Sequence, residues 1–154
     1  MKPTHLTTLL ASIILTALPM NASERPLAER RVIETLTKEK IPGLETKLKD
    51  ALGRKIPVTV DLATFPAGTE VFDWLESRGF ESVLSGLPKV ASDALGKQAL
   101  EAKVTADHFV YDYKIETVDK ALSFKDKTLV ITFYWDGALM LGGDLVAEQL
   151  AKML

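Results

Sequence analysis

The chain has 154 residues, with 19 basic and 21 acidic side chains, a formal net charge of −2 and no cysteine. The absence of cysteine excludes disulfides, a thiol nucleophile, a thiolate zinc site and an iron–sulfur cluster. The charge is close to balance and no basic stripe is concentrated anywhere, so binding to DNA or RNA is not expected. No cofactor motif is present, and none is predicted.

The first 22 residues have the layout of a secretory signal peptide. Lys2 supplies a positive charge, and residues 6–18 form an uncharged, mostly apolar run that Pro19 interrupts. Ala22 offers a small residue before the cut, although Met20 stands at −3, where a small residue is usual. We therefore predict a signal peptide over 1–22 and an exported domain over 23–154, either periplasmic or secreted.

An uncleaved membrane anchor is the alternative for the same segment. A spanning helix needs about 20 predominantly apolar residues, and the strongly apolar part of this leader is shorter. Cleavage would leave 132 of the 154 residues, the size of one domain. No later segment is long and apolar enough to span, so the mature chain is expected to be soluble and without a membrane span.

The first half of the mature chain is predicted to be mainly helical. Residues 23–40 are charged and helix-friendly, and we expect them either to pack as a first helix or to form a loosely docked helical arm. Residues 41–43 (Ile-Pro-Gly) interrupt this helix, and helical spacing resumes over 44–52 until Gly53. The period then changes to two over 56–62, which predicts a strand.

Further helices are predicted after this strand. Thr69 is suited to N-cap a helix that carries apolar residues over 71–75, and helical spacing recurs over 80–87 after Gly79. Pro88 is predicted to start another helical piece that reaches Leu95.

The final third of the chain is predicted to be rich in strands. Apolar and polar residues alternate over 108–115 and over 129–135. Residues 122–124 precede a Lys-Asp-Lys turn at 125–127, which predicts a hairpin into the last strand. A closing helix is predicted over 145–153. The fold expected is therefore a two-layer α+β domain, with a small, mainly antiparallel sheet of about four strands packed against helices.

Histidine and carboxylates are the first residues to consider for catalysis. Removal of the leader would leave His108 as the only histidine, so a two-histidine metal site is excluded within one chain, and no metal site is predicted. His108 shares a strand face with Asp112, but four residues span about 13 Å, too far for a direct dyad. A partner from another strand, Thr132 or Tyr134, would be needed.

Several carboxylates could supply an acid and a base, but their spacing selects no pair. We interpret these carboxylates as part of a solvated face. They are Asp61, Asp73, Glu76, Asp107 and Asp112. The polar site that a small hydrolase would use combines Asp61, His108 and Asp112. The chain lacks the G-x-S-x-G nucleophile elbow, which favours a protein without catalytic activity.

Binding is the function that the sequence favours. The segment 135–143 carries apolar residues between glycines. Either it is buried against the N-terminal helices, or it is exposed and marks an interface at Trp135, Leu139 and Met140. The first hypothesis is an exported, non-catalytic protein that binds a protein partner, of the inhibitor, immunity or envelope accessory type. The alternatives are a carrier of a small apolar ligand, held in the aromatic layer between sheet and helices, and the small hydrolase described above.

Overall fold

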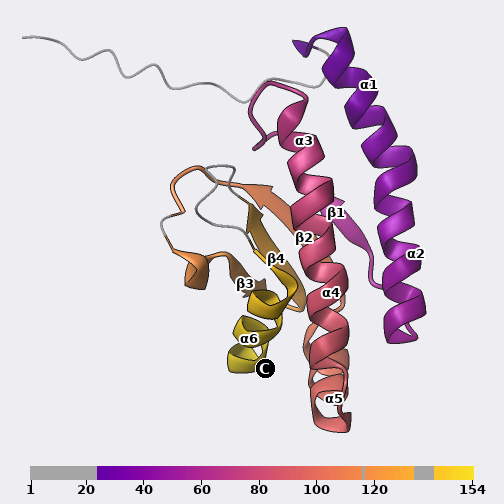
Figure 1. Cartoon of the computed structure of the whole chain (residues 1–154), viewed down its shortest axis with the longest axis vertical. Helices are drawn as coiled ribbons and strands as arrows, with labels where there is room; N and C mark the ends of the chain where they lie inside the picture. Colours follow the sequence, from indigo (N-terminus) through magenta and orange to yellow (C-terminus); the bar gives the residue numbers. More distant parts are fainter. Residues whose placement is uncertain (1–23, 116, 134–140) are drawn as a thin grey trace, which may run out of the picture.

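A computed structural model of the chain describes residues 24–115, 117–133 and 141–154. The α+β class is confirmed, because helices and a four-stranded sheet make up this part of the chain (Figure 1). In chain order the elements are α1 (Leu27–Thr35), η2 (Leu36–Lys40), α2 (Ile41–Leu52), β1 (Val58–Val60), α3 (Glu70–Trp74), η3 (Leu75–Phe80), α4 (Glu81–Val90), α5 (Ala94–Lys103), β2 (Ala106–Tyr111), η4 (Val118–Lys120), β3 (Leu122–Lys125), β4 (Thr128–Phe133) and α6 (Gly143–Met153).

Two long helical rods run side by side in Figure 1. The first joins α1, η2 and α2 without a break, and the second joins α3, η3 and α4. The middle segment of each rod, η2 or η3, is a π-helical turn. The predicted interruption at Pro42-Gly43 is wrong, because the rod continues through it. The wider π turn directly before Pro42 accommodates a ring that would otherwise clash within a regular helix.

The predicted break at Pro88 is also misplaced. Pro88 lies inside α4, which ends at Val90, and the chain turns over residues 91–93 before α5 begins. The Asp93 side chain caps the new helix by accepting a hydrogen bond from the backbone N–H of Gly96 at 2.8 Å. Pro88 is tolerated near the end of α4, where few helical hydrogen bonds depend on it.

The sheet has the order β1-β2-β4-β3, and its pairing corrects the expectation of a mainly antiparallel sheet. β1 pairs with β2, and β2 with β4, in parallel, while the predicted hairpin β3–β4 supplies the one antiparallel pair. The helices over 70–103 form the crossover that a parallel β1–β2 pair requires. Alternation of apolar residues indicates a half-buried strand, but it does not show whether the neighbouring strand is parallel or antiparallel.

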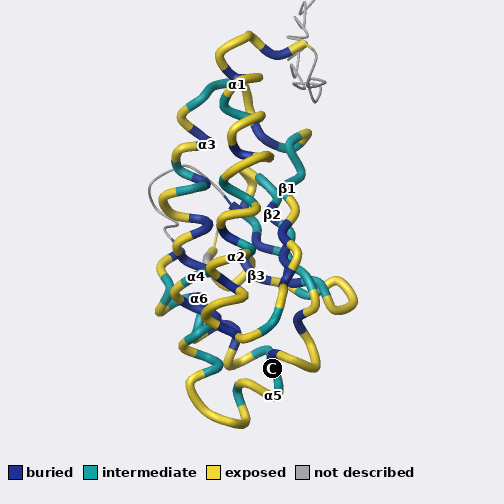
Figure 2. The backbone as a smooth tube through the Cα atoms, turned by 90° about the vertical axis from the view of Figure 1, so that its right-hand side faces the viewer, coloured by how far each residue is buried: buried dark blue, intermediate teal, exposed yellow. Residues whose placement is uncertain are grey.

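The helices lie on one side of the sheet, as Figure 2 shows. Burial alternates along β4, so that one face of the strand packs against the helices and the other is half-buried. Aromatic rings fill part of this core, with Phe80 edge-on to Phe109 at 5.1 Å between centroids. The largest side chains that are fully buried include Leu48, Phe72, Leu75, Leu87, Phe109, Leu129, Ile131 and Leu150.

A buried ion pair attaches the start of the described chain to the loop after β1. The Arg25 guanidinium donates to Glu29 Oε2 at 3.1 Å and to the carbonyl oxygens of Leu62 and Phe65 at 3.0 and 2.8 Å. Glu29 Oε1 accepts from the backbone N–H of Gly68 at 2.9 Å. These contacts hold the first turn of α1 against residues 62–68.

Candidate functional site

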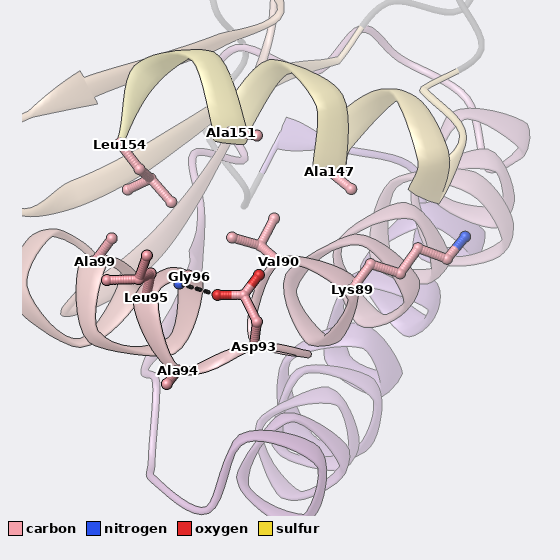
Figure 3. A pocket seen from close by; sticks show the side chains of 10 residues that line it. All are labelled: Lys89, Val90, Asp93, Ala94, Leu95, Gly96, Ala99, Ala147, Ala151 and Leu154. Atoms are coloured by element: carbon pink, nitrogen blue, oxygen red, sulfur yellow. Dashed lines mark hydrogen bonds between the residues drawn. The ribbon is translucent and has the colours of Figure 1, made fainter.

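An apolar groove lies between the C-terminal part of α6 and the helices α4 and α5 (Figure 3). Its volume is about 690 Å³, within the range of about 300–1,000 Å³ that is typical of small-molecule sites. The residues that line it are Lys89, Val90, Asp93, Ala94, Leu95, Gly96, Ala99, Ala147, Ala151 and Leu154. Most of them are alanine, glycine or aliphatic, so the interior of the groove is apolar.

The groove results from the way α6 packs against the second rod. Near the start of α6 the two helices approach closely, since a methyl group added at Gly86 would lie 2.6 Å from Val146 Cγ1. Further along, the rod ends at Val90 and the chain turns into α5. The facing positions on α6 are Ala147 and Ala151, whose short side chains leave the space between the helices unfilled.

Polar contacts stand at the two ends of the groove. At one end Lys89 Nζ lies 2.5 Å from Asp144 Oδ1. At the other, Lys103 Nζ donates to the carbonyl oxygen of Met153 at 3.1 Å, which connects the end of α5 to the end of α6. The carboxylate of Asp93 already accepts a hydrogen bond as the cap of α5. The groove can therefore bind an apolar group, with Lys89 at one end and the capped carboxylate of Asp93 beside Val90 and Gly96.

Leu95 is the most exposed large apolar residue that lines the groove. Its side chain is 79% exposed, although it stands next to the apolar surfaces of Ala99 and Val90. An exposed leucine at the rim of an apolar depression adds to the surface that a ligand or partner would cover. No periodic pattern in the sequence predicts this groove, because alanine and glycine on two helices distant in sequence look like ordinary helix surface.

The predicted polar site lies at the sheet. His108 is on β2, and its Nδ1 lies 2.7 Å from the hydroxyl oxygen of Thr59, on β1. Thr59 was not among the partners that the sequence indicated. The carboxylates serve turns instead: Asp61 Oδ1 accepts from the N–H of Ala63 and Asp112 Oδ1 from that of Lys114. Within the described residues, no hydrogen bond or ion pair joins His108 to either carboxylate.

The residues predicted for partner binding, Trp135, Leu139 and Met140, lie outside the described residues. Over the ranges that are described, no three histidine or acidic side chains are grouped so as to hold a metal ion. In the same ranges, no helix combines the length and the apolar character that a membrane span requires.

Asp107 is the residue that the sequence interpretation placed wrongly. The sequence predicts a solvated carboxylate at this position, but Asp107 is 0% exposed, between Val58 and Leu129 in the sheet register. Both of its carboxylate oxygens lack a hydrogen-bond partner. Burial raises its pKa to about 7, against the opposing charge of Arg54. The signal was available in the sequence, because Asp107 has the same parity on the strand as Phe109.

Comparison of the chain with protein family models, curated proteins and solved structures finds no match. The α5–α6 groove is therefore the feature that points to a candidate function.

Proposed function

We propose that the chain is an exported, non-catalytic binding protein that holds a small apolar ligand, or the apolar part of an amphiphile, between α5 and α6. The observation that carries this proposal is the groove of about 690 Å³ lined mainly by alanine, glycine and aliphatic residues. Sites for small molecules are typically apolar depressions of this size with few polar groups. Export to the periplasm or the outside is inferred from the layout of residues 1–22.

Burial of apolar surface would supply the binding free energy. Each methylene group that leaves water contributes about 0.8 kcal/mol, so about ten buried methylenes correspond to the roughly 8 kcal/mol of micromolar affinity. Lys89 lies at one end of the groove, where the polar end of an amphiphile could remain in water. The charged groups need not be desolvated for the apolar part to bind.

A protein partner is the second candidate, and the 79% exposure of Leu95 favours it. A leucine that projects from the rim of a groove is a suitable anchor for a complementary apolar surface. In this case the groove would receive an apolar side chain from the partner. The two candidates share a surface and differ in the occupant.

The test is a titration of the mature protein with N-phenyl-1-naphthylamine, a neutral apolar fluorophore. Ala99→Phe fills the groove, whereas Ala102→Phe places the same side chain at an exposed position of α5 that does not line it. We expect saturable binding to the unsubstituted protein and to Ala102→Phe, and at least about tenfold weaker binding to Ala99→Phe. Circular dichroism checks that both variants remain folded.

Equal binding of the fluorophore by both variants would refute the groove as the site. If the fluorophore does not bind at all, the carrier hypothesis is wrong, and capture from an envelope extract tests the second candidate. There, a partner that is retained by Ala102→Phe and lost by Ala99→Phe supports protein binding at the groove.

A further inference from the structure

A second cavity, of about 290 Å³, lies between the two helical rods, away from the α5–α6 groove. Its apolar lining comes from Val32 and Leu36 on the first rod and Phe72 on the second. Phe72 is 2% exposed, and its ring is held from another side by the guanidinium of Arg25, 5.9 Å from the ring centroid. The apolar part of the cavity is therefore fixed by the domain core.

An ion pair between the rods borders one side of this cavity. Lys40 Nζ lies 2.6 Å from Glu76 Oε1, and each residue belongs to a π-helical turn, η2 or η3. Both residues also line a smaller cavity of about 180 Å³, so the pair lies between the two spaces. π-helical turns interrupt regular helices and are frequent at functional sites.

Two further charges line the larger cavity from opposite walls. Arg31 comes from α1 and Asp73 from α3, and among the described residues neither forms an ion pair or a hydrogen bond. The pKa of Lys40 is raised mainly by its hydrogen bond to Glu76, and the charge of Asp73 adds to this effect. The charge of Asp73 is therefore close enough to Lys40 to act on it across this side of the cavity.

We propose that this cavity binds a small zwitterion with an apolar side chain, a free α-amino acid such as leucine. Its carboxylate would pair with the Arg31 guanidinium, whose planar fork suits a carboxylate, and its ammonium group with Asp73. Its side chain would contact Val32, Leu36 and Phe72. This site is independent of the α5–α6 groove and goes beyond the proposed function.

The size of the cavity favours a single amino acid over a longer peptide. At about 30 Å³ for each water molecule, 290 Å³ corresponds to about ten waters. Leucine has about nine non-hydrogen atoms, a similar number. A ligand that carries both charges can pair with Arg31 and Asp73 at once, whereas a simple anion or cation can pair with only one of them.

The experiment is isothermal titration of the mature protein with L-leucine, N-acetyl-L-leucine and L-leucinamide. The second probe lacks the ammonium group and the third lacks the carboxylate. We expect leucine to bind with a stoichiometry of about one, and each blocked probe to bind at least about tenfold more weakly, because one charge-assisted contact is lost. If either blocked probe binds as tightly as leucine, recognition of a zwitterion is wrong.

Matched variants test whether the site is the one described. Arg31→Gln and Asp73→Asn should each weaken leucine binding by about tenfold or more, while Arg30→Gln and Glu70→Gln, exposed neighbours that do not line the cavity, should leave it unchanged. No binding of leucine at millimolar concentration, or equal binding by all four variants, overturns the proposal. Binding of the apolar fluorophore to these variants is a separate readout, so failure here leaves the groove proposal standing.

Discussion

Replacement of Asp107 by asparagine is the most direct test of the core described above. Asp107 is fully buried on β2, and neither carboxylate oxygen has a hydrogen-bond partner. An ionised carboxylate in such surroundings is costly, so the group takes up a proton at a higher pH than it would in water. Asparagine has nearly the same shape and stays neutral, and the substitution therefore removes the charge without creating a cavity.

The magnitude follows from the two pKa values. The pKa of Asp107 is 3.8 when solvated and about 7 in the folded protein. Each pH unit between these values is worth about 1.4 kcal/mol, so the difference amounts to about 4 kcal/mol. The folded-state pKa is raised, which means that the folded state holds the proton more tightly. The ionisation of Asp107 therefore costs nothing below pH 3.8, becomes increasingly destabilising up to about pH 7, and keeps its full cost at higher pH.

Urea denaturation at several pH values between 4 and 8.5, followed by circular dichroism, measures this effect. Other carboxylates also titrate in this interval, so the quantity of interest is the difference in the free energy of unfolding between Asp107→Asn and the unsubstituted protein. We expect this difference to be small at pH 4 and to grow in favour of the variant by about 4 kcal/mol at pH 8. A difference that does not change with pH would show that Asp107 is not buried as an unpaired carboxylate.

Two further predictions concern packing and the buried ion pair. Gly86→Ala should lower stability by about 1–3 kcal/mol, because its methyl group would lie 2.6 Å from Val146 Cγ1. Gly43→Ala, in open space within α2, should raise stability by about 0.5–1 kcal/mol. Urea midpoints that shift in the same direction for both variants would contradict these two predictions. Arg25→Met should cost about 3–5 kcal/mol, because it leaves the Glu29 carboxylate buried without its cation. The double variant with Glu29→Leu should recover part of that loss in the same assay, and no recovery would mean that the ion pair is not the source of the cost.

The secondary structure could largely be predicted, because its periodic signals are local. The hairpin into β4 follows from alternation on both sides of a short polar turn, and Asp126 adopts the positive φ of 56° that this turn needs. The helix interruptions could not be placed in the same way. Proline and glycine often end a helix, but a helix can also continue through them. A π-helical turn before Pro42 lets the first rod continue where local propensity indicates a stop.

The predicted direction of the strands is wrong, because two signals in the sequence point to opposite pairings. A mixed outer face favoured an antiparallel sheet, whereas the long helical stretch between β1 and β2 required a crossover and hence a parallel pair. Asp107 lies two residues before Phe109 and therefore on the same face of β2, which likewise indicates a buried carboxylate. The α5–α6 groove had no comparable signal, because it depends on where two helices diverge after close contact at Gly86.

The two proposed sites involve opposite ends of the second rod, and this arrangement predicts that they bind independently. Phe72 and Asp73 border the zwitterion cavity at the start of the second rod, and Val90 borders the groove at its end. Between them Leu75 and Leu87 are completely buried, so this stretch is packed on the core along its length. Coupling between sites requires an element with two arrangements that both ligands bias, and a rod packed in this way offers one arrangement. Saturation with leucine should therefore change the affinity for N-phenyl-1-naphthylamine by less than about twofold, whereas a change above about fivefold would show that the rod has a second state.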